Sequence, residues 1–123
     1  MKLTKPIVYF DLETTGLSQT KDRIVELYML KENTDGTQEE FYSKFNPYPV
    51  TISEGAQEVH GISDEDLKDE PKFQDKADEI LQFLEGSDIS GYNIIYFDIP
   101  LLFEEFHRAG KIFNYRNYKI LDA

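Results

Sequence analysis

The sequence predicts an α/β domain in which helices pack against one mixed β-sheet, and three observations support this fold class. An uncharged run of β-branched and aromatic residues begins at Ile7, which is typical of a buried strand. Two further apolar runs, 23–31 and 38–45, flank a turn that contains Asp35-Gly36, which favours an antiparallel hairpin. Helical and strand patterns then alternate, so the third to fifth strands are expected to pair in parallel through right-handed helical crossovers.

The first helices are predicted from their capping residues. Ser53 is expected to cap a short helix that reaches His60, and Ser63 to cap another short turn. The strongest helical pattern covers residues 73–85, where apolar side chains recur on one face and Gly86 ends the helix. These helices are expected to pack against the sheet.

The last part of the chain predicts a strand, a helix and a final strand. Residues 88–92 are flanked by turn residues and are interpreted as a short buried strand. Pro100 suits the first turn of a helix that runs to about Arg108, and Gly110 closes this helix. Residues 118–121 form the last predicted strand.

Composition narrows the classes of protein to which the chain can belong. Its 123 residues suffice for one domain, 1–123, and 40% of them are hydrophobic, which is enough to build a core. The absence of cysteine excludes disulfides and thiolate metal sites and suits a reducing compartment such as the cytoplasm. No stretch is long enough to cross a membrane, so no membrane partner is expected. The net charge of −11 argues against a basic face that binds phosphates, but it is compatible with an enzyme that reaches phosphates through bound metal ions.

Paired acids mark the end of the first strand. Asp11 and Glu13 are two residues apart, so both carboxylates are expected on one face, and Gly16 is expected to end the strand with a backbone that most residues resist. Such a pair is costly unless a cation lies between its members, and a hard divalent ion takes oxygen ligands. The alternative is two acids at a solvated strand end. Asp98 also has two interpretations, as an ordinary N-cap or as a third carboxylate brought over the end of the first strand.

Three segments resemble a known family. Residues 10–17 (FDLETTGL) resemble the first exonuclease motif of the DEDD superfamily of 3′–5′ exonucleases, and Asn93 with Phe97-Asp98 resembles the second. Residues 56–62 resemble the stretch between these motifs in relatives of the proofreading epsilon subunit of bacterial DNA polymerase III. The chain is therefore similar to DEDDh-type exonucleases over nearly its whole length, with the motifs in the expected order.

The resemblance implies a ribonuclease H-like fold and hydrolysis of nucleotides from 3′ ends with two Mg²⁺ or Mn²⁺ ions. It implies that Asp11 bridges both ions, while Glu13 and Asp98 each hold one side of the pair. For His60, a structural role at a helix end is the alternative to substrate binding. Leu17 is implied to be an apolar wedge at the terminal base, and the other implied substrate-binding residues are Thr14, Thr15, Gly16, His60, Asn93 and Phe97.

The family completes its site with a third motif, in which a His precedes a fourth acidic ligand on a further helix. The sequence ends at Ala123 without that motif. We therefore expect the amino-terminal portion of a longer domain, truncated after the fifth strand, and a weak or inactive nuclease in isolation. The missing helix is expected to leave apolar sheet surface exposed, which favours self-association or a covering partner. The expected partners are the 3′ end of single-stranded DNA or RNA and either a polymerase or a second copy of the chain.

Two alternatives to an exonuclease remain. The first is a non-catalytic nucleic-acid or protein-binding module with the same fold, which the missing third motif favours and the intact Asp11, Glu13 and Asp98 oppose. The second is a phosphatase with an aspartyl nucleophile at a strand end, which would usually require a second Asp at the position of Glu13. Metal titration with a labelled single strand distinguishes the exonuclease from the first alternative, and trapping of a phospho-aspartate would reveal the second.

Overall fold

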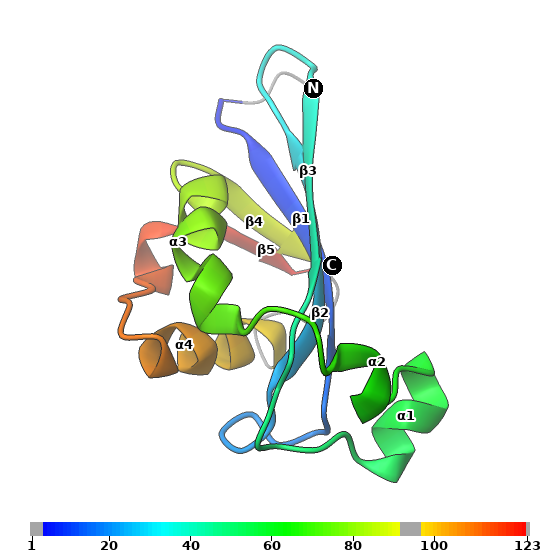
Figure 1. Ribbon diagram of the computed structural model, residues 1–123. Helices are drawn as coiled ribbons and strands as arrows, with labels where there is room; N and C mark the ends of the chain where they lie inside the picture. The colour runs from blue at the N-terminus through cyan, green and yellow to red at the C-terminus, as the bar shows by residue number, and fades with distance from the viewer. Residues whose placement is uncertain (1–3, 92–96, 123) are drawn as a thin grey trace.

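A computed structural model describes residues 4–91 and 97–122 of the chain. Within these residues, five strands form one sheet in the order β3-β2-β1-β4-β5 (Figure 1). The predicted mixed sheet is therefore confirmed. The strands are β1 (Ile7–Thr14), β2 (Ile24–Glu32), β3 (Gln38–Lys44), β4 (Asp88–Gly91) and β5 (Ile120–Asp122).

Strand pairing confirms the hairpin and corrects one connection. β2 pairs antiparallel with both β1 and β3, whereas β4 pairs in parallel with β1 and with β5. The expected parallel pairing of β3 with β4 is wrong, because β3 lies at the sheet edge beside β2. β4 lies between β1 and β5, where Ile89 is fully buried. Pairing with the polar and mostly exposed β3 would have left that apolar side chain nearer to water.

The last strand begins at Ile120 rather than at Tyr118 as predicted. A 3₁₀ turn over Tyr115–Asn117 precedes it, and the Tyr118 ring packs against Phe113 with 5.5 Å between the ring centroids. Aromatic packing thus holds Tyr118 before strand pairing starts.

The helices form where their caps predicted them. α1 (Glu54–His60) begins after Ser53, whose hydroxyl accepts a hydrogen bond from the Ala56 N–H at 3.1 Å. α2 (Asp64–Leu67) carries a capping box between Ser63 and Asp66. The longer helices are α3 (Phe73–Leu84) and α4 (Ile99–Arg108), and Gly86 and Gly110 follow them at positive φ values. In the described ranges, none of these helices is long and apolar enough to cross a lipid bilayer.

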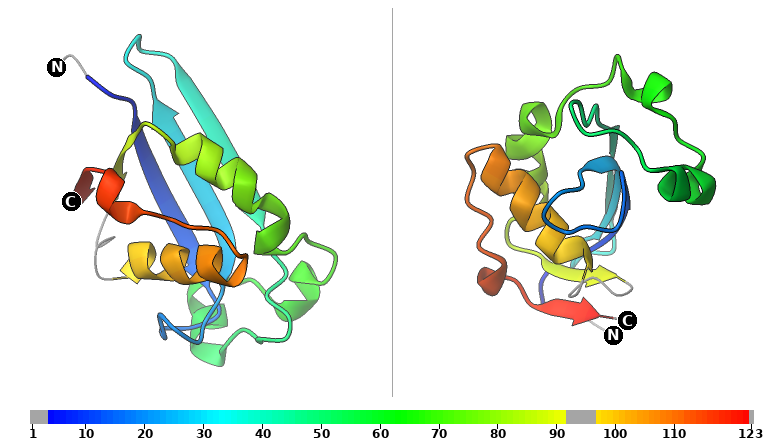
Figure 2. Two further views of the ribbon diagram at one scale, coloured as in Figure 1. Left: turned by 90° about the vertical axis from the view of Figure 1, so that its left-hand side faces the viewer. Right: turned by 90° about the horizontal axis from the view of Figure 1, so that it is seen from below.

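Helices α3 and α4 cover one face of the sheet (Figure 2). Val8 and Phe10 of β1 belong to the large apolar core between the sheet and these helices. Phe73 of α3 and Phe106 of α4 meet edge to face in this core, with 5.2 Å between the ring centroids. A second, smaller cluster packs against Ala56 of α1 and consists of Val25, Ile52, Ile62 and Leu67.

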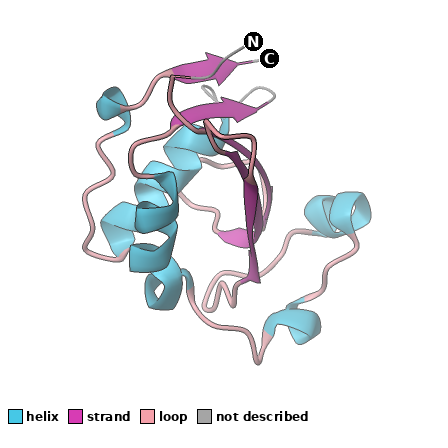
Figure 3. Ribbon diagram, turned by 90° about the horizontal axis from the view of Figure 1, so that it is seen from above, coloured by secondary structure: helices cyan, strands magenta, loops and turns pink. Residues whose placement is uncertain are grey.

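On the other side of the sheet the described helices are α1 and α2, which lie near one end of it (Figures 1 and 3). Tyr9, Tyr28 and Tyr42 occupy this open face and are 39%, 36% and 55% exposed. The expected exposed sheet surface is therefore present. It is less apolar than expected, because carboxylates such as Glu26 and Glu40 lie among the tyrosines.

Candidate active site

The end of β1 carries the paired acids. Asp11 and Glu13 alternate with buried apolar residues, so both project from the open face of the sheet, as their spacing predicts. Glu13 lies opposite Glu26 of β2. Partial burial and the neighbouring Asp11 carboxylate raise the pKa of Glu13 above its ordinary value; Glu26 adds to this rise, whereas His60 opposes it.

This arrangement of charges suits a cation. Asp11, Glu13 and Glu26 share one face of the sheet, and positive charge bound among them would relieve their mutual repulsion. Carboxylate oxygens are also the ligands that hard divalent ions prefer. The donor chemistry at the end of β1 therefore fits a divalent metal ion.

Asp98 directly precedes α4. Its backbone already has right-handed helical angles, with φ −68° and ψ −44°, and its side chain makes no capping hydrogen bond. A capping residue has an extended backbone and accepts a hydrogen bond from the first turn. The interpretation of Asp98 as an ordinary N-cap therefore does not hold.

The three predicted metal ligands do not form one cluster in this structure. Within residues 4–91 and 97–122, no group of three or more His, Cys, Asp or Glu side chains is arranged to hold a metal ion. The convergence of Asp98 on Asp11 and Glu13 thus stays a prediction. Asn93, which was predicted to bind substrate, lies outside the described residues.

A cavity of about 330 Å³ opens beside Glu13. Its walls come from the end of β1, from the corner that follows β1, from α1 and from Phe97. It therefore brings together six of the residues predicted to bind metal or substrate, namely Glu13, Thr14, Gly16, Leu17, His60 and Phe97. Five further lining residues were not predicted from the sequence: Leu12, Ser53, Gly55, Ala56 and Val59.

Two exposed apolar side chains line this cavity. Leu17 is 88% exposed and Val59 is 83% exposed, so neither contributes much to the core. Such side chains are available to contact a flat apolar group of a ligand. A signal for Val59 was present in the sequence, because helical spacing places Ala56, Val59 and His60 on one face of α1.

His60 joins α1 to the end of β1. Its Nδ1 accepts a hydrogen bond from the Ile62 N–H at 3.0 Å, and its Nε2 lies 3.0 Å from the Thr14 carbonyl oxygen. Because Nδ1 accepts, the ring proton is assigned to Nε2, which donates to Thr14. The structural interpretation of His60 therefore holds, and the same ring also lines the cavity.

Thr15 and Gly16 both lie against Asp22, and the substrate-binding role of Thr15 stays a prediction. Thr15 does not line the cavity; its buried hydroxyl donates to Asp22 Oδ1 at 2.6 Å and accepts from the Arg23 N–H at 2.9 Å. Gly16 does not have a positive φ. An ideal Cβ at Gly16 would lie 2.7 Å from Asp22 Oδ2, so the close approach of Asp22 requires the glycine, not an unusual backbone.

The sheet order and the helices that flank the sheet define a ribonuclease H-like domain. The chain belongs to the exonuclease family, because the family model RNase_T, described as Exonuclease, matches residues 8–121. The family resemblance seen in residues 10–17 is thereby confirmed.

Curated relatives carry names that agree with this family. The chain is 30% identical over 117 residues to the DNA polymerase III subunit epsilon of Buchnera aphidicola, a match that covers 90% of the chain and 49% of that protein. It is 31% identical over 117 residues to the 3′-5′ exonuclease DinG of Bacillus subtilis, with 94% and 12% covered. It is 38% identical over 100 residues to the epsilon subunit of Rickettsia conorii, with 80% and 43% covered. The chain thus spans about half, or less, of the length of these relatives.

Solved structures establish the fold. Exonuclease I of E. coli in complex with a dT13 oligonucleotide superposes with a TM-score of 0.85 at 18% identity, covering 97% of the chain and 28% of that enzyme. The ExoI/SSB-Ct complex superposes with a TM-score of 0.84 at 18% identity, with 98% and 28% covered. The expected ribonuclease H-like fold is confirmed by these likenesses.

Proposed function

We propose that the chain is a 3′–5′ exonuclease domain, or the amino-terminal part of one, that removes nucleotides from the 3′ ends of single-stranded DNA or RNA. The observation that carries this proposal is the cavity at the end of β1, where the Glu13 carboxylate and exposed apolar side chains lie together. Membership of the exonuclease family supports the same reaction class. The polymerase subunits among the relatives favour a polymerase as the protein partner.

The cavity residues would bind the 3′-terminal nucleotide. Leu17 and Val59 are exposed apolar side chains that can contact the two sides of a base, and Phe97 offers a ring on which a base can stack. A base held there would bring the terminal phosphodiester toward Glu13, which lines the same cavity. Binding and chemistry would thus be adjacent.

Asp11, Glu13 and Asp98 are the residues that would hold two Mg²⁺ or Mn²⁺ ions. Exonucleases of this family generally use divalent metal ions. When held by these carboxylates, such ions would supply activation of a water molecule and stabilisation of the leaving oxygen. Asp11 and Glu13 already share one face at the end of β1, and Asp98 would complete the ligand set from the start of α4.

A non-catalytic module that binds nucleic acid is the second candidate. The observation that favours it is that Asp11, Glu13 and Asp98 do not form a cluster suited to a metal ion in the described part of the chain. Such a module would bind an oligonucleotide in the cavity without a requirement for divalent ions and without hydrolysis.

Mn²⁺ binding and hydrolysis distinguish the two candidates. We would measure Mn²⁺ binding by electron paramagnetic resonance and single-turnover hydrolysis of an end-labelled oligonucleotide for the unmodified chain, Asp11→Asn and Asp69→Asn. Asp69 is an exposed acid after α2 and serves as the matched control. We expect Asp11→Asn alone to weaken Mn²⁺ binding and to abolish the slow hydrolysis. Hydrolysis retained by Asp11→Asn would contradict the metal assignment, and metal-independent binding without hydrolysis would favour the second candidate.

A further inference from the structure

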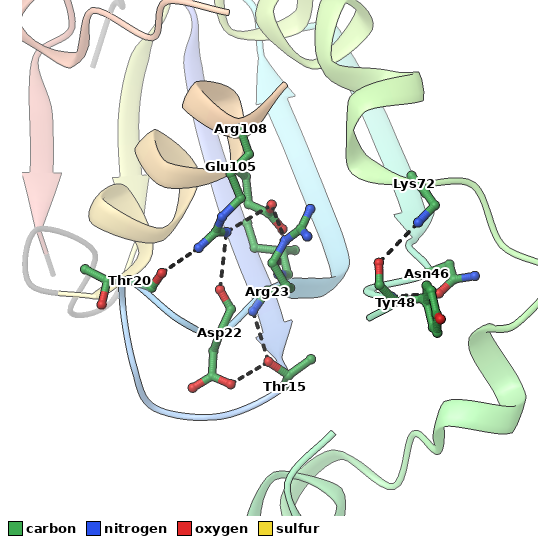
Figure 4. Close-up of polar contacts among 10 residues, drawn as sticks. Thr15, Thr20, Asp22, Arg23, Asn46, Tyr48, Lys72, Glu105 and Arg108 are labelled. Atoms are coloured by element: carbon green, nitrogen blue, oxygen red, sulfur yellow. Dashed lines mark hydrogen bonds and ion pairs between the residues drawn. The ribbon is translucent and has the colours of Figure 1, made fainter. Parts of the chain in front are cut away.

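A buried carboxylate holds the loop between β1 and β2 against α4 (Figure 4). Glu105 of α4 is 1% exposed, and its carboxylate accepts hydrogen bonds from Arg23 Nε at 2.7 Å and from the Ile24 N–H at 2.9 Å. A buried carboxylate is costly without such partners. Glu105 is therefore a fixed point at which the end of this loop is attached to α4.

Arg108 extends this attachment along the loop. Its Nη2 donates to the Thr20 carbonyl oxygen at 2.6 Å, and its Nη1 lies 3.4 Å from Glu105 Oε1 and 3.5 Å from the Asp22 carbonyl oxygen. The planar guanidinium presents several donors in a fixed geometry, so one side chain can hold two loop carbonyls and Glu105 together. Figure 4 shows Arg108 reaching from α4 toward Thr20 and Asp22.

Asp22 connects the attached loop to residues 15–18, which form the corner after β1 beside the cavity. Its Oδ1 accepts from the Thr15 hydroxyl at 2.6 Å, and its Oδ2 accepts from the Ser18 N–H at 2.8 Å. The same carboxylate packs against Gly16 so closely that a Cβ at this position would displace it. Asp22 thereby determines the path of Gly16 and Leu17, which line the cavity.

The contacts made by Glu105, Arg108 and Asp22 therefore connect two walls of one cavity. Gly16 and Leu17 belong to the wall that the loop carries, and Phe97 belongs to the wall that leads into α4. Because α4 is one continuous helix, a loop that shifts relative to Glu105 also shifts relative to the start of that helix. The separation of the two walls then changes.

We propose that Glu105 and Arg108 are positioning residues for the 3′-terminal nucleotide. They hold residues 15–23 against α4 and thereby set the width of the cavity that receives that nucleotide. This inference rests on the proposed function, and it adds residues that lie outside the cavity lining.

The test compares two internally labelled thymidine oligonucleotides of the same length, one linear with a free 3′ end and one closed into a circle. Their affinities for the 123-residue chain are measured by fluorescence anisotropy with Mn²⁺ present. The variants are Glu105→Gln and Arg108→Gln. The matched controls are Glu104→Gln, which removes the preceding acid of α4, and Lys111→Gln, which removes a base that pairs with Asp78. Circular dichroism confirms that each variant is folded at the assay temperature.

We expect Glu105→Gln and Arg108→Gln to lower the preference for the linear oligonucleotide by between about tenfold and a hundredfold, because small displacements of binding groups have effects of this size. The affinity of these two variants for the circular oligonucleotide should be unchanged. Both control variants should bind both oligonucleotides as the unmodified chain does. A purely structural role would weaken the binding of both oligonucleotides alike. If Glu105→Gln unfolds, Arg108→Gln still decides the question. In Arg108→Gln the ion pair between Arg23 and Glu105 is kept, so this variant should remain folded.

Folded variants that keep the full preference for the linear oligonucleotide would overturn the positioning role, as would an equal loss for both oligonucleotides. An unmodified chain without any preference would overturn the proposed function, and the positioning role with it. That result appears in the unmodified protein, so it is distinct from a failure of the positioning role alone.

Discussion

Position 16 requires glycine because the Asp22 carboxylate occupies the space that a larger side chain would need. An alanine Cβ would lie 2.7 Å from Asp22 Oδ2, so the carboxylate would have to move and its bonds to Thr15 and Ser18 would be strained. We expect Gly16→Ala to lower the free energy of unfolding by about 1–3 kcal/mol, the usual range for overpacking. Urea denaturation measures this change.

Gly55→Ala is the matched control for that substitution. Gly55 lies in α1, and apart from the helix's own backbone and the neighbouring residues no atom of the described residues lies within 4 Å of its ideal Cβ. Alanine has the higher helix propensity, so this variant should be neutral or more stable by up to about 1 kcal/mol. Similar destabilisation by both substitutions would contradict the close approach of Asp22 as the reason for Gly16.

On the open face of the sheet, the hydrogen bond between Tyr42 and Glu26 makes the stability of the fold depend on pH. Its hydroxyl donates to Glu26 Oε2 at 2.5 Å, and this bond, with some burial, raises the pKa of Tyr42 from 10.0 to about 12. The folded state holds the proton more tightly than the unfolded chain, so this stabilisation is present below pH 10.0 and is lost as the pH rises toward 12. An NMR titration of the Tyr42 ring should show the high midpoint, and Glu26→Gln should lower it. A midpoint that the variant leaves unchanged would count against the bond.

Residues whose role depends on local spacing could be predicted from the sequence. Asp11 and Glu13 are two apart in a strand, and that spacing alone places them on one face. Glu105 could not be predicted, because its partner Arg23 is 82 residues away and no local pattern indicates such a contact. The contacts of Thr15 and Gly16 with Asp22 could not be predicted for the same reason, since both depend on a residue across a loop.

Among the elements, α1 is attached to the sheet mainly at its ends. No residue of α1 is buried. The Ser53 N–H, just before the helix, donates to the Thr15 carbonyl oxygen at 2.8 Å, and His60 at the last position contacts the Thr14 carbonyl oxygen. One wall of the cavity thus depends on two hydrogen bonds more than on core packing.

This attachment predicts that α1 opens more readily than its neighbours. Native-state hydrogen exchange should be faster in α1 than in β1, because local opening of a helix with few buried contacts costs little free energy. His60→Ala should accelerate exchange in α1 further and leave α3, whose Phe73, Ala77, Ile80 and Leu84 are buried, unchanged. Protection of α1 equal to that of β1 would contradict this picture.

Helices were easier to predict than strand neighbours. Ser53 and Ser63 are capping residues, and their side chains act within three residues of the helices they begin. The position of β4 beside β1 depends instead on how the long segment after β3 crosses the sheet. Hydrophobic periodicity indicates which face of a strand is buried, but not which strand lies next to it.

For the whole molecule, the net charge of −11 limits how a nucleic acid can bind. No lysine or arginine is among the described residues that line the cavity. Few phosphates would therefore be neutralised by side chains. At fixed Mn²⁺, the logarithm of oligonucleotide affinity should fall against the logarithm of NaCl concentration with a slope of only about −1 to −2. Fluorescence anisotropy at several NaCl concentrations measures it, and a much steeper slope would indicate a basic binding surface elsewhere on the molecule.

The proposed function requires that the cavity at the end of β1 receives the 3′-terminal nucleotide. The direct measurement is an NMR titration of the ¹⁵N-labelled chain with thymidine 5′-monophosphate and Mg²⁺, which reports on each backbone amide separately. We expect the largest shifts at the amides of Leu17, Val59 and His60, which line this cavity. The contradicting result would be shifts concentrated at the larger cavity of about 480 Å³ that Phe103 and Tyr115 line, with the amides at the end of β1 unmoved.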